Sequence, residues 1–433
     1  MKIAIFTDLF LENSGGIPSV IKAQKMELEK RDHEVVVFCP GFLVDKNRKQ
    51  KAYDGGNLTE EFMQENVVLV PTRKWRINGV PMAKKVKEIM NFIDEKYNIA
   101  EFDLVHVHYE MGCSIAGVLL AKKYNVPIVQ TMHGREDAAL MLNVPVVLRK
   151  VVAGILNFLH KKYLKHDVLA KDILKMKLNF IKNKEMAKMW EIMIGQAMAA
   201  DVIMTPSRHF AKKFEEIFKK AGILRQIIVA PNGINQEFWQ KNAPFRKFDG
   251  GRPLNLVWNS RVSREKRIMV VLEALKIVTE KVGNDKIGMV VFGDGNQLRR
   301  AERFVQKNNL PVKFMGRRKR GEIFAKMLES DLAVMASNGF DTMGMTLIEA
   351  ELQALPVVFC DEDMKEVVPE GGGILTKGVD SLAFAEVFLE ILQKPEKIER
   401  MSLIMDVSRE AVLMKRRILP VIQAYDLAQK MRK

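Results

Sequence analysis

The chain has 433 residues, of which 48% are hydrophobic and 28% charged, as in folded globular proteins of two or three domains. No apolar stretch approaches the ~20 residues of a membrane span, and the three scattered cysteines (Cys39, Cys113 and Cys360) have no metal-ligand spacing and suit a reducing compartment. The net charge of +16 favours a polyanionic partner; because no nucleic-acid-binding motif is present, we expect an anionic membrane surface and no nucleic acid.

The first half of the chain alternates short apolar segments with amphipathic ones, which predicts a parallel sheet with helices on both faces. The first segment, MKIAIFTDLF, predicts a strand and not a signal peptide, because Asp8 and Glu12 interrupt the apolar run. The predicted strands are residues 3–7, 33–39, 67–70, 104–108, 128–133, 202–205 and 227–230. The predicted helices between them include residues 18–31, 82–95 and 114–124.

Two glycines, Gly15 and Gly16, separate the first predicted strand from the first predicted helix. Backbone N–H groups at such a helix start can hold a phosphate. The glycine pattern is shorter than a dinucleotide-binding motif, and no Walker motif is present. The sequence therefore argues against both dinucleotide binding and P-loop hydrolysis.

Residues 143–200 break the alternation with a long, lysine-rich helical stretch. One predicted helical stripe in it carries six apolar residues: Leu148, Val151, Val152, Ile155, Phe158 and Leu159. Cationic residues stand at the ends of the stripe: Arg149, Lys150, Lys161, Lys162 and Lys165. Two interpretations fit this pattern, namely an interfacial helix with its apolar side in a bilayer, or a helix packed on the domain with its lysines in water.

The second half begins after residues 232–253, whose Asn, Gly, Pro and charged residues predict a linker. The alternation then restarts, with predicted strands at 256–259, 287–292, 312–315 and 332–335 and predicted helices at 269–281, 297–308, 321–328, 345–355 and 381–393. We therefore predict an α/β protein in which two doubly wound, Rossmann-like domains face each other across a cleft. The predicted domains span 1–231, with 143–200 as a basic helical insertion, and 254–407, and a helical tail at 408–433 can pack back on the first domain.

The most informative stretch is SNGFDTMGMTLIEAELQALP, which follows an apolar strand of the second half. Gly344 lets the backbone approach a ligand, and the helix that begins at Met345 and Thr346 offers unpaired N–H groups to an anion. Asp341 precedes this helix and Glu349 lies within it, so both carboxylates can face the same anion. The alternative interpretation is an ordinary strand–loop–helix connection with two solvated acids.

Two loops of the second half add further candidates. The loop SRVSREK follows the first strand and carries Arg261 and Lys266. Two fixed cations at a strand end suit a diphosphate leaving group, on which negative charge develops as its bond breaks. Gly293, in the loop FGDG, predicts by itself only a tight turn, and a basic loop by itself also fits a solvated surface.

Three histidines lie in or at the end of strands of the first half. His133, in QTMHGRED, is a candidate hydrogen-bond partner for a sugar or a phosphate, although a structural histidine fits the same position. His106 and His108 lie in one strand, in LVHVHYEMG, and we expect only one of them to face the ligand. No metal-ligand spacing connects these histidines.

Together these motifs resemble the retaining glycosyltransferases of family 4, which have the GT-B fold. The resemblance covers essentially the whole chain and includes HGRED, TPSRHF, PNGIN, SRVSREK, FGDG and the spacing from Asp341 to Glu349. It implies that the first domain binds an acceptor and the second a nucleotide-sugar donor. It also implies that no metal or other cofactor is required, because the departing phosphate oxygen takes the acceptor proton on the front face of the sugar.

The same resemblance implies roles for single residues. Arg261 and Lys266 should hold the donor diphosphate, Glu349 the nucleotide ribose, and Asp341 should lie near the donor sugar. Other residues of the expected donor site are Gly293, Gly344, Met345 and Thr346. The loop of Gly15 and Gly16 should close over the diphosphate, and His133 should lie beside the reacting sugar.

A narrower resemblance is to the monoglucosyldiacylglycerol synthases. It is carried by VHYEMGCSIAGVLLAKKYNVPIVQTMH, DTMGMTLIEAELQALPVV and DEDMKEVVPEGG. It implies UDP-glucose as donor, a lipid such as diacylglycerol as acceptor, and a peripheral location on the inner, cytoplasmic face of the cell membrane. A basic segment lies where these enzymes meet the bilayer: Arg73, Lys74, Trp75 and Arg76 with Lys84, Lys85 and Lys87.

The chain also departs from the usual family pattern. Asp341 stands where the family has Glu, and Ser260 and Ala354 stand where it has Gly. The shorter Asp341 keeps the charge but can change the preferred sugar. Two alternatives therefore stay open, namely the same chemistry on a soluble sugar, polysaccharide or protein, and a GT-B-shaped binding protein without turnover. The sequence leaves the oligomeric state undetermined.

Overall fold

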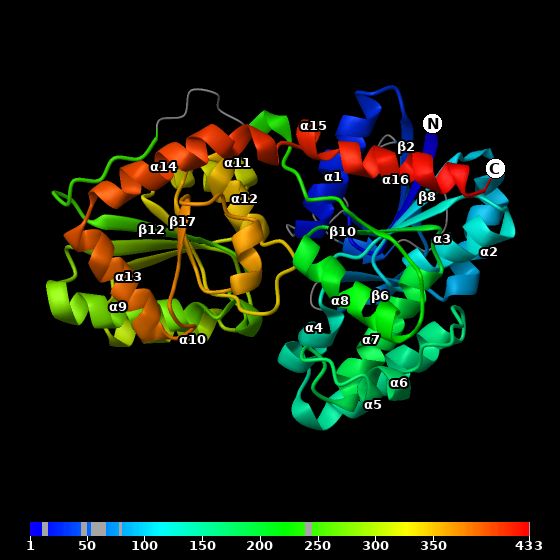
Figure 1. The fold of residues 1–433 in the computed structure, drawn as a ribbon, viewed down its shortest axis with the longest axis horizontal. Helices are drawn as coiled ribbons and strands as arrows, with labels where there is room; N and C mark the ends of the chain where they lie inside the picture. The colour runs from blue at the N-terminus through cyan, green and yellow to red at the C-terminus, as the bar shows by residue number, and fades with distance from the viewer. Residues whose placement is uncertain (11–15, 45–49, 53–65, 78–79, 239–244, 433) are drawn as a thin grey trace. The chain divides into compact units, whose positions relative to one another are not determined.

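The computed structural model describes residues 1–10, 16–44, 50–52, 66–77, 80–238 and 245–432. The chain forms two compact units (Figure 1). Unit 1 comprises Met1–Pro231 and Arg417–Lys433, and unit 2 comprises Asn232–Arg416. Of the helices that the structure describes, none is both long enough and apolar enough to cross a membrane.

Unit 1 is built on a seven-stranded sheet in the order β11-β10-β9-β8-β1-β2-β5, and every neighbouring pair is parallel. The strands are β1 (Lys2–Thr7), β2 (Glu34–Pro40), β5 (Val67–Val70), β8 (Leu104–His108), β9 (Ile128–Thr131), β10 (Val202–Thr205) and β11 (Ile227–Val229). Most of their side chains are buried on both faces, which is why these strands read as continuous apolar runs. The order reverses at β1, where β2 lies on one side and β8 on the other.

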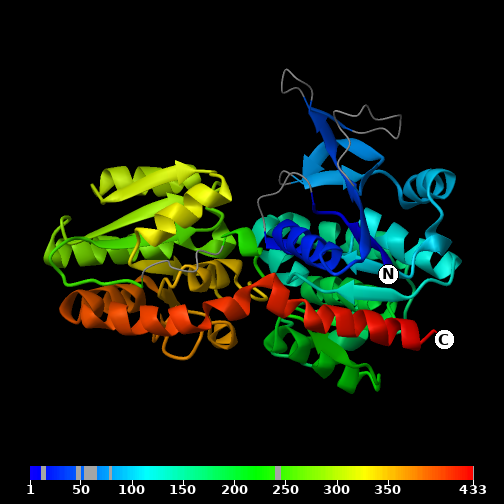
Figure 2. The same ribbon diagram turned by 90° about the horizontal axis from the view of Figure 1, so that it is seen from above.

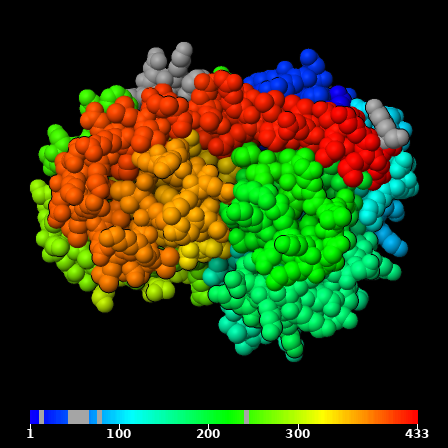
Figure 3. All heavy atoms as spheres, viewed as in Figure 1, coloured from blue at the N-terminus to red at the C-terminus, as the bar shows by residue number. Residues whose placement is uncertain are grey.

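Helices cover this sheet: α1 (Gly16–Glu29), α2 (Val86–Lys96), α3 (Gly112–Lys123), α8 (Arg208–Lys220) and α16 (Leu419–Lys430). Helix α3 packs on β1 and β8, whereas α16 packs on β8 to β11. Arg432 of the last turn donates to Asp201 at 3.1 Å and to Asn125 at 2.9 Å. The C-terminal residues therefore belong to unit 1, on whose surface they lie as a red band (Figure 3).

The insertion at 143–200 is helical, and a further helix, α4 (Glu136–Asn143), precedes it. It consists of α5 (Val146–Lys161), α6 (Ala170–Lys175) and α7 (Lys184–Met198). Trp190 of α7 is fully buried against Phe210 and Phe214 of α8. The opposite side of α7 contributes Met189 and Ile192 to a small cluster with Ala153 of α5. Helix α7 thus connects α5 to the body of unit 1.

Unit 2 has a six-stranded parallel sheet in the order β14-β13-β12-β15-β16-β17. Its strands are β12 (Leu254–Asn259), β13 (Ile287–Phe292), β14 (Val312–Gly316), β15 (Leu332–Met335), β16 (Val357–Phe359) and β17 (Gly373–Leu375). Its helices are α9 (Ile268–Val282), α10 (Leu298–Lys307), α11 (Arg320–Leu328), α12 (Met345–Leu352), α13 (Ser381–Gln393), α14 (Glu396–Ser408) and α15 (Met414–Arg417). Figure 1 shows α9, α10 and α13 on one face of this sheet and α11 and α12 on the other. Each face has its own apolar cluster.

The predicted linker, residues 232–253, is part of unit 2. Ile234 forms an isolated parallel bridge with Leu413, and its backbone N–H donates to the carbonyl of Val412 at 2.9 Å. The chain therefore passes between the units at Pro231 and again at Arg416.

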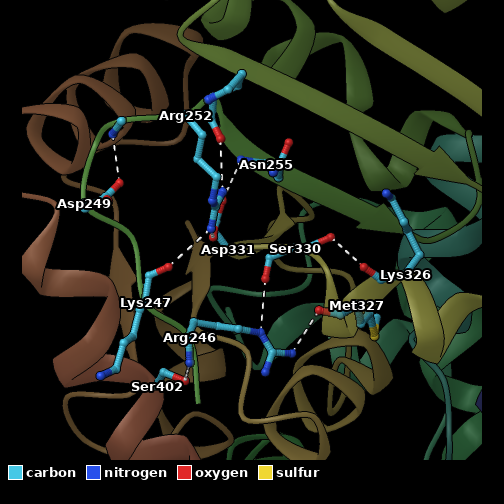
Figure 4. A network of polar contacts seen from close by, with 12 residues as sticks. Arg246, Lys247, Asp249, Arg252, Asn255, Lys326, Met327, Ser330, Asp331 and Ser402 are labelled. Carbon is cyan, nitrogen blue, oxygen red and sulfur yellow. Dashed lines mark hydrogen bonds and ion pairs between the residues drawn. The ribbon is translucent and has the colours of Figure 1, made fainter. Parts of the chain in front are cut away.

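Two arginines attach this segment to the sheet (Figure 4). Arg246, which is 5% exposed, donates to the carbonyls of Met327 and Ser330 at 2.9 and 3.1 Å. Arg252 holds the buried carboxylate of Asp331 with two hydrogen bonds of 2.6 and 2.7 Å. These partners are 79 to 84 residues away in sequence, so the local composition does not reveal them.

Two short antiparallel hairpins were not predicted: β3 (Phe42–Val44) with β4 (Gln50–Ala52), and β6 (Thr72–Ile77) with β7 (Val80–Ala83). Figure 2 shows them at one side of unit 1. The basic segment 73–76 lies in β6, and Lys84, Lys85 and Lys87 surround the start of α2, which begins four residues later than predicted because β7 takes residues 80–83. The side chains of Trp75 and Arg76 lie outside the described residues.

Candidate active site

The candidate donor site lies at the carboxyl edge of the unit 2 sheet. The order of this sheet reverses between β12 and β15, the position at which open α/β sheets bind ligands. The loop after β12 carries Arg261 and Lys266, and the loop after β15 carries Asp341. Gly344 ends that second loop with φ +61°, a left-handed conformation that favours glycine, and α12 begins at the next residue. The two predicted loops therefore meet at one edge.

Lys266 and Asp341 form an ion pair across this edge. The lysine Nζ lies 2.5 Å from Oδ1 of Asp341, and the Ser337 hydroxyl donates to Oδ2 of the same carboxylate. The Lys266 ammonium also lies 5.3 Å from the centre of the Phe340 ring. The side chains of Lys266 and Asp341 are only 14% and 13% exposed, so water screens this pair weakly.

The environment of Asp341 favours its ionised form. Burial alone would raise the pKa of this carboxyl, but the charge and hydrogen bond of Lys266 outweigh burial and hold the pKa below its ordinary value. The Ser337 hydroxyl and the charge of Arg261 act in the same direction on this pKa. Asp341 is therefore a fixed anion that can accept hydrogen bonds from sugar hydroxyls.

Arg261 is the more accessible cation of the site. Its side chain is 57% exposed, and Nη2 lies 2.8 Å from Oε1 of Glu265, which is completely buried. The Ser263 hydroxyl donates to the same oxygen at 2.5 Å. Glu265 therefore fixes one side of the guanidinium, whereas the exposed side can meet a phosphate.

Glu349 is held by two residues that sequence reasoning missed. Asn259, the last residue of β12, donates Nδ2 to Oε2 at 2.7 Å, and Arg320, the first residue of α11, donates Nη2 to Oε1 at 2.6 Å. The Arg320 guanidinium also lies 5.7 Å and 6.0 Å from the Phe238 and Phe324 ring centres. The basic run RRKR after β14 was the only signal for Arg320, and it does not single out one of its four cations.

Burial raises the pKa of Glu349, although the charge and hydrogen bond of Arg320 and the hydrogen bond from Asn259 oppose the shift. Thr346, one helical turn before Glu349, donates its hydroxyl to the Asn259 carbonyl at 2.7 Å. Met345 is the first residue of α12. The hydroxyl of Thr346 and the side chain of Asn259 thus hydrogen-bond the end of β12 to α12, and the second of these bonds is the one to Glu349.

Gly293 supports the basic loop. Its φ is +122°, and a Cβ atom there would lie 2.1 Å from the Ser260 carbonyl oxygen. Its N–H donates to the Gly316 carbonyl at 2.9 Å. The FGDG loop is thus packed against the backbone that precedes Arg261, a close approach that the tight-turn prediction did not contain.

Replacing Gly293 by alanine is expected to destabilise unit 2 by about 2–5 kcal/mol, because strain at this φ and a collision with backbone both add cost. Gly316→Ala is the matched control, since Gly316 has φ +64° and an added Cβ would meet no atom within 4 Å. We expect it to cost about 1–2 kcal/mol. Urea unfolding of the full chain measures both, and equal losses would contradict the packing argument.

The structure explains one departure from the family pattern. Ala354 has φ +50°, in the left-handed region where glycine is unstrained, and it is fully buried. Its carbonyl accepts a hydrogen bond of 2.6 Å from the Ser402 hydroxyl. The chain thus keeps a backbone conformation suited to glycine while carrying alanine. Nothing in the structure explains Ser260.

In unit 1 the three histidines form a buried row, which corrects one expectation. His106 and His108 point to the same face of β8, because residues two apart in a strand do so, and their ring centres lie 3.9 Å apart. His108 Nδ1 lies 2.7 Å from His133 Nε2, and His106 Nδ1 lies 2.8 Å from the hydroxyl of Tyr425 in α16. The two strand histidines therefore share one face, so the alternation on which the expectation of a single ligand-facing histidine rested was wrong. Which of them faces the ligand stays a prediction.

These histidines are uncharged near neutral pH. Burial lowers the pKa of His106 and of His133 to about 3, and it lowers that of His108 well below its usual value. His133 is 5% exposed, two residues past β9, and one of its ring nitrogens is bonded to His108. Its predicted contact with the reacting sugar stays a prediction.

Beside this row lies a group of buried carboxyls that the sequence did not reveal. Neither carboxyl oxygen of Glu110 has a hydrogen-bond partner among the described residues, although the side chain is only 5% exposed. Burial, together with the charges of Glu136 and Asp8, raises its pKa well above the usual value. Burial likewise raises the pKa of Glu136 to about 7. Tyr109, next to Glu110, has φ +98°, a strained conformation of the kind that clusters at functional sites.

The predicted phosphate loop is described only in part. Gly15 lies outside the described residues, and Gly16 is the first residue of α1. In the described part of the chain, no three His, Cys, Asp or Glu side chains are grouped so as to hold a metal ion.

Comparison with known families decides the class of the protein. Residues 14–238 match Glycosyltransferase Family 4, and residues 244–403 match Glycosyl transferases group 1. The chain belongs to glycosyltransferase family 4. The predicted family is therefore confirmed, and the protein is a glycosyltransferase.

Two similar proteins carry the same name. The chain is 24% identical over 373 residues to an alpha-monoglucosyldiacylglycerol synthase of Streptococcus pneumoniae, covering 83% of this chain and 70% of that protein. It is 22% identical over 416 residues to an alpha-monoglucosyldiacylglycerol synthase of Acholeplasma laidlawii, covering 93% and 91%. The glycosyltransferase therefore resembles glycolipid synthases along most of its length.

Solved structures confirm the GT-B fold. The pneumococcal O-GlcNAc transferase GtfA, solved with UDP and GlcNAc, superposes with a TM-score of 0.66 at 12% identity and 99% coverage of both chains. HepE of Anabaena, solved with UDP-glucose, superposes with a TM-score of 0.60 at 15% identity, covering 100% of this chain and 99% of that chain. At sequence identities this low, the similarity establishes the fold alone.

Proposed function

We propose that this glycosyltransferase moves glucose from UDP-glucose to a membrane lipid such as diacylglycerol, with retention of the anomeric configuration. The observation that supports a nucleotide-sugar donor is the Lys266–Asp341 pair, with Arg261 beside it at the start of α12. A lipid acceptor is supported by the two similar proteins named alpha-monoglucosyldiacylglycerol synthase. UDP-glucose is supported by HepE, which was solved with that molecule.

The donor has a natural place at the carboxyl edge of unit 2. Its diphosphate lies against Lys266, Arg261 and the first N–H groups of α12, the helix that begins after Gly344. Glu349 accepts hydrogen bonds from the ribose, and its two partners hold the carboxylate in place for this purpose. Asp341, held ionised, accepts hydrogen bonds from hydroxyls of the glucose.

The reaction exchanges one C–O bond for another on the same face of the sugar. The bond between the anomeric carbon and the phosphate oxygen breaks, and a bond from that carbon to the acceptor oxygen forms. The acceptor proton passes to the departing phosphate oxygen, so that UDP carries it away. Lys266 and Arg261 stabilise the charge that develops on the diphosphate, and this stabilisation is the chain's main contribution to the rate.

In this proposal unit 1 binds the acceptor and its reacting hydroxyl. Glu110 has no hydrogen-bond partner among the described residues, and burial raises its pKa, so its carboxyl is suited to hydrogen-bonding an uncharged hydroxyl. The enzyme would meet its acceptor at the inner face of the cell membrane, where the net charge of +16 favours anionic lipid.

The test is UDP release from UDP-glucose by the purified protein, with and without vesicles of phosphatidylglycerol that contain diacylglycerol. We expect release only with these vesicles, together with a glucosyl lipid whose anomeric proton shows the α-configuration in NMR spectra. Release that depends instead on a water-soluble sugar or protein would replace the lipid acceptor. Binding of UDP-glucose without release under any condition would overturn the transfer itself.

A further inference from the structure

Helix α5 turns its apolar side outward. Seven of its apolar side chains are between 49% and 84% exposed: Val146, Val147, Leu148, Val151, Ile155, Phe158 and Leu159. They are seven of the eighteen large apolar side chains that are exposed among the described residues. Scattered exposed apolar residues are normal, but a contiguous group on one helix marks an interaction surface.

The exposed residues form one face. Val147, Val151, Ile155 and Phe158 follow one another at intervals of four, four and three, which is the spacing of residues along one side of an α-helix. Figure 1 shows α5 at the periphery of unit 1, with α7 between it and the sheet. We call the seven residues the outer face of α5.

The side of α5 that packs on the protein has small or polar residues at its most buried positions. Its buried residues are Ala153, Asn157 and His160. Asn157 donates Nδ2 to the Lys188 carbonyl at 3.2 Å, and His160 Nε2 lies 3.2 Å from Oε1 of Gln196. A surface helix of a globular domain ordinarily shows the reverse arrangement, with apolar residues inward. Val152 and Leu156 also pack, partly buried, against the cluster that joins α5 to α7. These contacts and the hydrogen bonds attach α5 to α7, whereas the seven residues of the outer face take no part in that packing.

Cations accompany this outer face. Lys150, Lys162 and Lys165 are exposed at its two ends. Residues 143–200 hold eleven Lys and Arg against four Asp and Glu. Apolar side chains together with cations match an anionic lipid surface, where negative headgroups lie directly above the acyl chains. An apolar groove of a protein partner would match the apolar side chains but not the cations.

We propose that the outer face of α5 inserts into the headgroup region of an anionic bilayer and holds the enzyme on that surface. The inference rests on the proposed lipid acceptor and adds the element that meets the membrane. It also chooses between the two interpretations of residues 143–200: α5 is the interfacial helix, and its hydrogen-bonded inner side is what fixes it to the protein.

The test compares two double variants that add the same charge. Val151→Asp with Phe158→Asp places two carboxylates on the outer face, at side chains that are 56% and 70% exposed. Leu382→Asp with Val407→Asp does the same on α13 and α14 of unit 2, at side chains that are 61% and 87% exposed. All four positions are exposed, so neither variant removes core packing.

Binding is measured by cosedimentation with vesicles of phosphatidylglycerol and phosphatidylcholine, and with phosphatidylcholine alone. We expect the α5 variant to bind the anionic vesicles at least tenfold more weakly, and the α13/α14 variant to stay within twofold of the unchanged protein. Changing Lys150, Lys162 and Lys165 to Gln should weaken binding severalfold and reduce its salt dependence. Brominated lipid should quench the fluorescence of the tryptophan introduced by Phe158→Trp. It should not quench the fluorescence of the tryptophan introduced by Leu382→Trp.

A second readout separates this inference from the proposed function. Dihexanoylglycerol below its micellar concentration presents the acceptor without a bilayer. We expect the α5 variant to use it at the unchanged rate while losing most activity on vesicles. If the unchanged protein binds vesicles through α5 but transfers to neither acceptor, only the proposed function fails. If the α5 variant binds vesicles normally, or only converts a dimer into monomers in sedimentation velocity, the inference is overturned.

Discussion

The Lys266→Ala variant is expected to transfer the sugar about 10²–10³-fold more slowly than the unchanged protein, because one fixed cation is removed from the developing charge of the diphosphate. The loss should appear in kcat, with UDP affinity reduced about tenfold or less, since the charge on the leaving group grows in the transition state. Steady-state kinetics and calorimetry with UDP measure the two effects. Lys276→Ala is the control, because Lys276 forms an ion pair with Glu280 on the surface of α9.

A purely structural role for Lys266 has to be tested separately, because its removal leaves the buried Asp341 carboxylate unpaired. Combining Lys266→Met with Asp341→Asn removes both charges and so relieves this cost. If the lysine only neutralises Asp341, the double variant recovers the rate of the Asp341→Asn variant. If the lysine acts on the diphosphate, the double variant stays as slow as Lys266→Met while its urea midpoint recovers.

The buried histidines of unit 1 are expected to lower its stability between pH 7.5 and pH 5, because they resist protonation in the folded state. The raised pKa values of Glu110 and Glu136 act in the opposite direction and offset part of this loss. In this range the unfolded chain binds protons at an ordinary histidine pKa of 6.5, whereas the folded pKa of His106 and of His133 is about 3. The unfolded state therefore holds more protons, so stability rises with pH and is lost as pH falls from about 6.5 toward 3. Each histidine contributes about 2 kcal/mol at pH 5, and His108 acts in the same direction.

Urea titrations at pH 7.5 and pH 5 measure this loss when hydrogen exchange is followed in peptides from β8 and β9. In the His106→Gln variant, which is less stable at neutral pH, the difference between the two pH values should shrink by about one histidine's share. His209→Gln changes a histidine of α8, outside the buried row, and serves as control. If the His106→Gln variant shows the same difference between the two pH values as the unchanged protein, the low folded pKa of His106 is contradicted.

Local sequence patterns were sufficient to predict the architecture and to select the residues of the candidate donor site. Both sheets are parallel and buried on both faces, so their strands appear as apolar runs separated by amphipathic helices. Gly344 and the basic loop after β12 are recognisable because helix starts and strand ends have their own residue preferences. The pairing of Lys266 with Asp341 then follows from the strand order, which brings the ends of β12 and β15 together.

Other features depend on residues that are far apart in the chain. Asn259 and Arg320 reach Glu349 over 90 and 29 residues, and Tyr425 reaches His106 over 319. The hydrogen bonds of Arg246 also join residues more than 80 apart in the chain, so the local composition, rich in Gly and Pro, predicted a linker there. Composition records which residues a segment contains, but not which distant carbonyl or carboxylate satisfies them.

By itself, then, the sequence determined the family, the two Rossmann-like sheets and the cations of the candidate donor site, because each depends on short motifs or on local periodicity. Only the tertiary structure decided which partners hold Glu349, that the three histidines form one buried row, and which side of α5 faces outward. An apolar stripe on a helix looks the same whether it is packed or exposed, and the hydrogen bonds of Asn157 and His160 to α7 turn this one toward solvent. The physical reason is that helical periodicity fixes which residues share a face, whereas the contacts of the folded chain fix where that face points.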